Sequence, residues 1–214
     1  MKTKQFFLIP MMALSVFAVS CSQTGTKPKT GDQTAATPDK EVDLSNVTFS
    51  KDLSRVVWFG EMLGLYSHEG TVDLAQADLK IQDGKIAGGV FVVDMLTITP
   101  TDQNYKPEEG STPEKLVAHL SNADFFDVPN HPAARFEITR MDQNTAEGIL
   151  TIRGVSKQET IENIAVSKED NLVTIKGELV FDRKAFNVAW DHPIKDRVLS
   201  SDIKISIQLV GEKV

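Results

Sequence analysis

The sequence of 214 residues contains a single cysteine, Cys21. An intramolecular disulfide is therefore impossible, and a metal site built from several thiolates is excluded. The four histidines, His68, His119, His131 and His192, include no closely spaced pair of the H-x-H or H-E-x-x-H kind. We expect no metal site.

Positive charge is also scarce. Lys and Arg number 23 against 30 Asp and Glu, which gives a formal net charge of −7. Because binding to nucleic acid requires clustered cationic groups, this balance makes nucleic acid a poor partner. The chain has no G-x-S-x-G motif, P-loop or dinucleotide fingerprint, and Gly88-Gly89 does not make one. We predict neither a catalytic residue nor a cofactor, and so no enzyme.

Residues 1–20 have the pattern of an export signal. A positively charged start with Lys2 and Lys4 precedes an apolar run over residues 6–19. This run is shorter than the roughly 20 residues that a membrane-spanning helix needs. It ends in Ala18-Val19-Ser20-Cys21, which resembles the lipobox of bacterial lipoproteins, whose cysteine is acylated and becomes the first mature residue. An ordinary secretory signal followed by a free thiol at Cys21 is the alternative.

The next segment has the composition of a linker. Residues 22–40 contain no aromatic or large aliphatic side chain and are rich in Thr, Pro, Gly and Lys. Such a segment buries too little apolar surface to offset the entropy of ordering it. We interpret residues 21–41 as a flexible tether that starts at the acylated cysteine, and residues 42–214 as one folded domain. The acyl chains would hold the protein to a membrane of the bacterial cell envelope, on a periplasmic or outer-membrane face.

Alternating apolar and polar residues dominate the folded region and predict strands. Asp83-Gly84 is a strong hairpin signal between two of them. The segment 85–98 is apolar almost throughout; a buried helix is the competing interpretation, but its glycine pair and β-branched residues favour a strand. The predicted strands are 54–60, 71–81, 85–98, 135–140, 147–153, 159–167, 173–181 and 203–209. About eight strands indicate an all-β antiparallel sandwich or closed barrel.

One short helix is expected over residues 113–120. Thr112 supplies a hydroxyl cap, Pro113 suits the first turn, and an acidic residue follows. Residues 64–70, bounded by glycines, read as a turn or lid. The stretch 119–139 contains the neighbouring Phe125 and Phe126. It is predicted to cover an apolar interior like a lid and then to continue as a strand that forms part of the wall of that interior.

Two ionisable side chains need partners. Asp94 lies in an apolar strand, where an unpaired charge is costly, and Arg183 is its candidate ion-pair partner. His119 is explained by the dipole and the free carbonyls at a helix end, and His131 by a structural role. His68 is the candidate for a polar group at the mouth of the barrel.

The order and spacing of several landmarks resemble the YceI-like family of periplasmic lipid-binding proteins, over roughly residues 45–210. The landmarks are Ser54-x-Val56-x-Trp58, His68-x-Gly70, Gly89-x-Phe91-x-Val93-Asp94-Met95-x-x-Ile98, His119-Leu120-Ser121-x-x-Asp124-Phe125-Phe126-Asp127, Pro132-x-x-x-Phe136, Gly148-x-Leu150-Thr151-Ile152-x-Gly154-Val155 and Phe181-Asp182-Arg183-x-x-Phe186. The resemblance implies an extended lipocalin-like barrel of about eight strands with a small helix. It also implies a polyisoprenoid or isoprenoid-quinone ligand in an apolar tunnel. Many members carry a histidine near the positions of Met62 and Leu63, where this chain has none.

The resemblance and the strand faces together give the candidate tunnel-lining residues: Val56, Trp58, Phe91, Val93, Met95, Leu120, Phe125, Phe126, Phe136, Ile138, Phe181 and Phe186. The same side chains could instead fill the barrel and make it a solid scaffold for protein interaction. A second alternative is an enzyme on a lipid-linked or quinone substrate, with His68 or Asp94 as acid or base. A homodimer is a further expectation.

Overall fold

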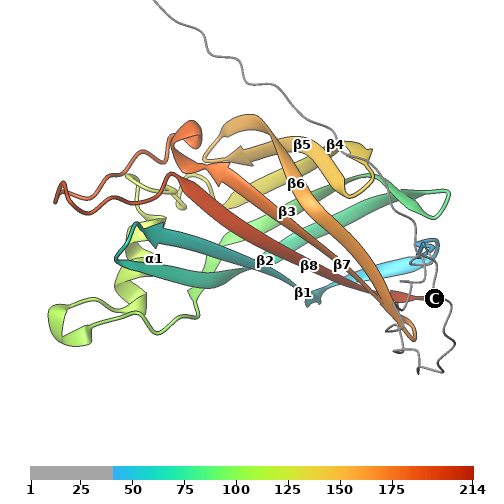
Figure 1. Cartoon of the computed structure of the whole chain (residues 1–214), viewed down its shortest axis with the longest axis horizontal. Helices are drawn as coiled ribbons and strands as arrows, with labels where there is room; N and C mark the ends of the chain where they lie inside the picture. The colour runs from blue at the N-terminus through green and yellow to red at the C-terminus, as the bar shows by residue number, and fades with distance from the viewer. Residues whose placement is uncertain (1–40) are drawn as a thin grey trace, which may run out of the picture. The chain divides into compact units, whose positions relative to one another are not determined.

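The computed structural model describes residues 41–214, which form a closed barrel of eight antiparallel strands. Each strand pairs with the next one in the chain, and β1 pairs with β8 to close the sheet (Figure 1). The strands are β1 (Val47–Met62), β2 (Tyr66–Gln82), β3 (Lys85–Pro100), β4 (Ala133–Asp142), β5 (Thr145–Ile152), β6 (Val155–Glu169), β7 (Leu172–Asp182) and β8 (Asp202–Lys213). The predicted all-β, lipocalin-like architecture is confirmed.

The predicted hairpin between β2 and β3 is present. Asp83 and Gly84 have φ angles of 51° and 76°, the positive values that a two-residue turn matching the twist of the strands requires. The segment 85–98 is a strand, so the helical alternative is wrong. Most strands extend beyond their predicted bounds, because their polar ends still pair with a neighbour although they bury little apolar surface.

The predicted turn or lid over residues 64–70 is wrong in part. The chain turns only around Gly64, and β2 already begins at Tyr66. Gly70 lies within β2, opposite Trp58 of β1. A Cβ atom at Gly70 would lie 2.3 Å from the Trp58 ring, so this glycine permits a close approach of the indole to the backbone.

The helix α1 (Pro113–Ser121) begins where the sequence predicts. The Thr112 side chain accepts a hydrogen bond of 3.3 Å from the backbone N–H of Lys115, and Pro113 stands in the first turn. Two 3₁₀ helices, η1 (Pro107–Glu109) and η2 (Arg183–Phe186), complete the described elements. In residues 41–214, no helix has the length and apolar character to cross a membrane.

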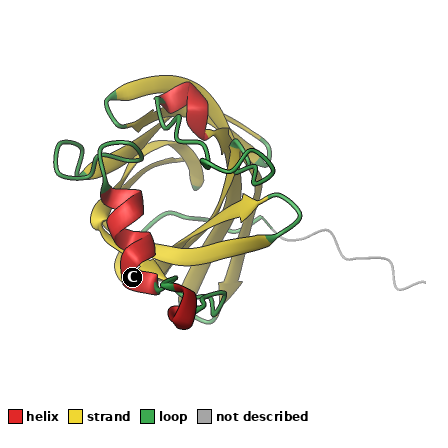
Figure 2. Ribbon diagram, turned by 90° about the vertical axis from the view of Figure 1, so that its left-hand side faces the viewer, coloured by secondary structure: helices red, strands yellow, loops and turns green. Residues whose placement is uncertain are grey.

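The helix α1 packs against β3 and lies at one end of the barrel (Figures 1 and 2). We call this the α1 end; β1, β3, β5 and β7 run toward it, and the other four strands run away from it. At the opposite end β1 starts and β8 finishes, and Val47 pairs with Lys213. There Lys213 Nζ lies 3.1 Å from Asp43 Oδ2.

Candidate functional site

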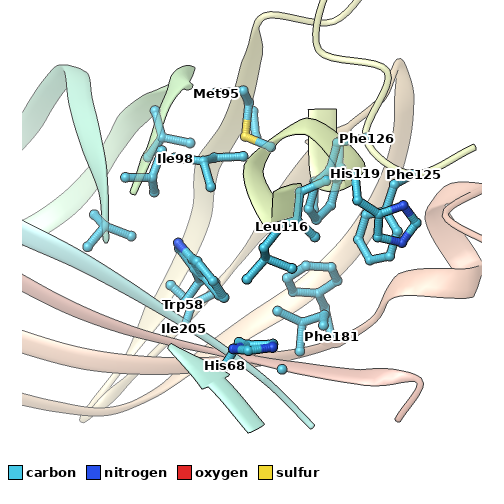
Figure 3. A pocket seen from close by; sticks show the side chains of 18 of the residues that line it. Trp58, His68, Met95, Ile98, Leu116, His119, Phe125, Phe126, Phe181 and Ile205 are labelled. Atoms are coloured by element: carbon cyan, nitrogen blue, oxygen red, sulfur yellow. The ribbon is translucent and has the colours of Figure 1, made fainter. Parts of the chain in front are cut away.

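The barrel encloses a cavity of about 540 Å³ in the half nearer the α1 end (Figure 3). All eight strands contribute side chains to its wall, and α1 and the segments around it complete the wall. Lys115 and Pro193 line the cavity and are also exposed, so the cavity reaches the surface at this end. Its volume lies within the range of small-molecule sites in proteins, ~300–1,000 Å³.

Ten of the twelve candidate tunnel residues lie on the cavity wall. They are Val56, Trp58, Phe91, Val93, Met95, Leu120, Phe125, Phe126, Phe136 and Phe181. Ile138 instead lines a second, smaller cavity deeper in the barrel. Phe186 is fully buried behind the wall, with its ring centroid 5.5 Å from that of Phe181.

Several wall residues were not among the sequence candidates. Ile203, Ile205 and Ile207 of β8 line the cavity. The regular alternation of β8 was the signal that could have found them. Trp190 and His192 come from the irregular segment 187–201, which has no periodic pattern to mark them.

Polar groups on the cavity wall gather at the α1 end. The side chains with a hydroxyl, amine, guanidinium or imidazole group are Tyr66, His68, Ser111, Thr112, Lys115, His119, Arg135 and His192. The deeper wall is apolar and includes Leu74, Phe91, Leu150, Leu179 and Ile207. The cavity therefore has one polar end that reaches the surface and one apolar interior end.

His68, which we predicted to be the polar group at the mouth, lies on the cavity wall. Asp102 and Tyr105, from the segment between β3 and α1, hold its imidazole in place. Its Nδ1 lies 3.1 Å from Asp102 Oδ1, and its ring stacks on that of Tyr105 with centroids 4.9 Å apart. The Tyr105 hydroxyl donates a hydrogen bond of 3.2 Å to the same carboxylate. The segment between β3 and α1 is thereby attached to the start of β2.

The pKa values in this cluster are perturbed. Burial alone would raise the pKa of Asp102, but hydrogen bonds from the backbone N–H groups of Asn104 and Glu69 and from His68 hold it below the usual value. Burial and the neighbouring Asp102 carboxylate raise the pKa of Tyr105 to about 12. The cluster therefore favours a charged carboxylate and a protonated phenol.

The side chain of His119 turns into the cavity, which corrects the prediction that it holds the end of the helix. Its ring meets that of Phe125 edge-on, with centroids 5.4 Å apart (Figure 3). It also meets the ring of Trp190 edge-on, with centroids 4.6 Å apart. Its buried Nε2 has no hydrogen-bond partner among residues 41–214. The helix end is closed by the backbone instead, since the N–H of Asn122 donates to the His119 carbonyl at 3.2 Å.

Arg183 does not pair with Asp94, so the predicted ion pair is wrong. Asp94 lies on β3 between β2 and β4, whereas Arg183 follows β7, and the Asp94 carboxylate accepts a hydrogen bond from the N–H of Leu96 at 2.9 Å. Arg183 is fully buried, and its Nη2 lies 3.4 Å from Asp191. Burial lowers the pKa of Arg183, and Asp191 opposes that shift.

The guanidinium of Arg183 instead holds the segment 187–201. It donates to the backbone carbonyls of Val188 at 2.7 Å, Trp190 at 2.8 Å and Ser200 at 2.9 Å. Arginine suits this position because its planar guanidinium can donate to several carbonyl groups at once. In the part of the chain that the structure covers, no group of three or more His, Cys, Asp or Glu side chains could hold a metal ion.

An eight-stranded lipocalin-like barrel around an apolar internal site is therefore the class that the fold and the cavity define. The YceI-like domain family matches residues 39–211. The chain belongs to this family.

Two solved structures show the same fold. BcnA of Burkholderia cenocepacia is 21% identical, with a TM-score of 0.61, over 76% of this chain and 99% of that one. A polyisoprenoid binding domain from Saccharophagus degradans, implicated in plant cell wall breakdown, is 7% identical, with a TM-score of 0.51, over 79% and 99% of the two chains. A search of curated proteins found no significant match.

Proposed function

We propose that the protein binds an amphiphilic lipid of the isoprenoid type, a polyisoprenoid or an isoprenoid quinone, and carries or sequesters it at the bacterial cell envelope. The observation that carries the proposal is the 540 Å³ cavity with one polar and one apolar end. Burying a hydrocarbon chain there contributes ~25 cal/mol for each Å² of apolar surface removed from water. The similarity to a polyisoprenoid binding domain supports this ligand class.

The polarity of the cavity wall sets which end of the ligand lies at the α1 end. A polar head group would lie near His68, Lys115 and His119, and the chain would extend inward past Trp58 toward Phe91. Nε2 of His119 is covered by protein atoms in the ligand-free protein, and a rotation of the ring would bring it to an oxygen of the head group, which removes the cost of a buried polar atom without a hydrogen bond. Binding, without a chemical step, is the role that this arrangement supports.

The first test is to purify the protein from its native membrane and extract it for mass spectrometry. We expect a co-purifying lipid with a long apolar chain. The second is titration with a C20 prenyl alcohol, in which Phe126→Asp should weaken binding at least about tenfold because it places a charge on the apolar wall. Val180→Asp is the matched control, since Val180 is 50% exposed on β7. Empty protein together with no saturable binding would refute the proposal.

Two alternative roles lead to different results. The barrel is not filled, because it encloses the 540 Å³ cavity; a scaffold for protein interaction would bind no prenyl alcohol at all. An enzyme would turn over its lipid substrate, and His68→Ala would abolish turnover while leaving binding intact; the hydrogen bond between His68 and Asp102 is the observation that would favour it. The homodimer stays a prediction, which analytical ultracentrifugation would test.

The membrane anchor is a separate part of the proposal. Residues 1–20 would direct export and Cys21 would be acylated; both lie outside the described residues, and the lipobox-like sequence supports them. Two or three acyl chains would keep the cavity near the bilayer from which the ligand must come. Metabolic labelling with an alkynyl fatty acid should label the wild-type protein and Ser22→Ala but leave Cys21→Ala unlabelled. Labelling of Cys21→Ala would refute the anchor.

A further inference from the structure

A second cavity of about 30 Å³ lies in line with the first one inside the barrel. The direction of the strands fixes its position. Along β8, which leaves the α1 end, Ile203 and Ile205 line only the first cavity, Ile207 lines both, and Leu209 lines only the second. The second cavity is thus farther from the α1 end.

The strand β3, which runs in the opposite direction, gives the same order. Ile86 lines only the second cavity, Phe91 lines both, and Val93 and Met95 line only the first. On β6, Ile161 lines both cavities and Ile164 only the second. The side chains shared by the two cavities, Phe91, Ile161 and Ile207, therefore separate them, and we call these three the partition.

We propose that the partition is the end-stop for the ligand's hydrocarbon chain and that Phe91 sets the longest chain the protein accepts. This inference rests on the proposed function, because the head group at the α1 end fixes the point from which the chain is measured. The space beyond the partition is about 30 Å³, a small fraction of the 540 Å³ of the first cavity. A chain that has filled the first cavity can therefore extend into the second only if the partition moves.

Phe91 is the member of the partition whose removal opens the passage most. Ile161 is fixed by its neighbours, since a Cβ at Gly177 would lie 2.7 Å from its Cγ2, and Ile207 is β-branched with restricted rotamers. Phe91 carries the largest side chain of the three and is only half-buried. Phe136 is the residue of β4 that pairs with Phe91. Its ring packs closely on Gly148, where a Cβ would lie 2.5 Å from it, so Phe136 is held in place.

The experiment is a titration of the purified full chain with prenyl alcohols that grow by one isoprene unit from C10 upward. The affinity of the wild-type protein should rise by at least about tenfold per unit, as buried apolar area increases, and then stop rising at a defined length. Phe91→Ala joins the two cavities, so its limit should move to a chain at least one unit longer. Phe91→Leu, which keeps the core better filled, should move it in the same direction.

Met95→Ala is the matched control. Met95 is on the same strand and the same wall but nearer the α1 end, so its truncation widens the first cavity without opening the partition. It should lower affinity at every length and leave the limit unchanged. An unchanged limit in both Phe91 variants, or an equal shift in Met95→Ala, would overturn the end-stop while leaving lipid binding intact. Wild-type protein that binds no prenyl alcohol of any length would overturn the proposed function and the end-stop together.

Discussion

Nη1 of the fully buried Arg183 donates a hydrogen bond of 2.8 Å to the backbone carbonyl of Trp190, whose ring lines the cavity. This contact links the end of β7 to an irregular segment that supplies part of the polar end of the site. Arg183, at the start of η2, thus helps to fix where Trp190 lies on the cavity wall.

We expect Arg183→Lys to lower the free energy of unfolding by on the order of 3 kcal/mol, because a lysine ammonium cannot replace the forked contacts and leaves buried carbonyls without donors. Urea unfolding measures the change. Arg140→Lys is the control: Arg140 is 61% exposed in its pairs with Asp142 and Glu147, so this change should stay within about 0.5 kcal/mol. Equal stability of the two variants would contradict the role assigned to Arg183.

Gly70→Ala should destabilise the barrel by about 1–3 kcal/mol, since the new methyl group would lie 2.3 Å from both the Trp58 ring and the Thr99 carbonyl oxygen, so the ring and the backbone must shift. The displacement should change the fluorescence of Trp58, measured in a Trp190→Phe background so that Trp58 is the one tryptophan left. Gly60→Ala is the matched control in the neighbouring strand, where the nearest atom, Ile203 Cδ1, is 3.6 Å away. A Gly70→Ala protein as stable as Gly60→Ala would show that the indole is not held against β2.

The lowered pKa of Asp102 gives stability with a defined pH dependence. Because the folded-state pKa lies below that of the unfolded chain, about 3.9, the contribution is complete above that value and is lost as the pH falls through the folded pKa. Asp102→Asn should therefore lose roughly 1–2 kcal/mol at pH 7 through weakened hydrogen bonds. The loss relative to wild type should shrink as the pH falls below about 4. Chemical unfolding at several pH values tests this, with Asp52→Asn on the exposed part of β1 as the control. A loss independent of pH would contradict it.

His119→Phe keeps a ring between Phe125 and Trp190 and removes the unpaired nitrogen, so the ligand-free protein should be as stable as wild type or slightly more stable. Its affinity for a prenyl alcohol should fall about tenfold, while its affinity for a prenyl hydrocarbon without a head group should not change. His131→Phe, outside the cavity, should affect neither ligand. Equal loss for both ligands would mean that His119 contributes only apolar contact.

Much of the barrel could be predicted from the sequence, because a period of two along a strand fixes which side chains face inward. That rule places Val56, Phe91 and Phe181 inside, and their positions on the wall agree with it. It gives the face but not the depth: Phe136 and Ile138 point the same way, yet one lines the first cavity and the other the second. Depth depends on the tilt and register of eight strands at once.

The errors concern contacts that depend on distant parts of the chain. Arg183 has an acidic candidate partner in Asp94, but the two lie on opposite stretches of the sheet, and the carbonyls that Arg183 binds belong to a segment without a sequence pattern. His119 stands at a helix end, where a structural role is common, and only the position of Trp190 shows that the ring faces the cavity.

The pairing of β1 with β8 places Asp43 within 3.1 Å of Lys213 at the end opposite α1. A short linker could therefore join residues 42 and 214, and new termini could be made in the exposed loop around Pro107. The same geometry suits insertion of the whole barrel into a surface loop of a host protein. Such a chimaera would leave the α1 end free, so the barrel would present its cavity to the solvent from within another protein.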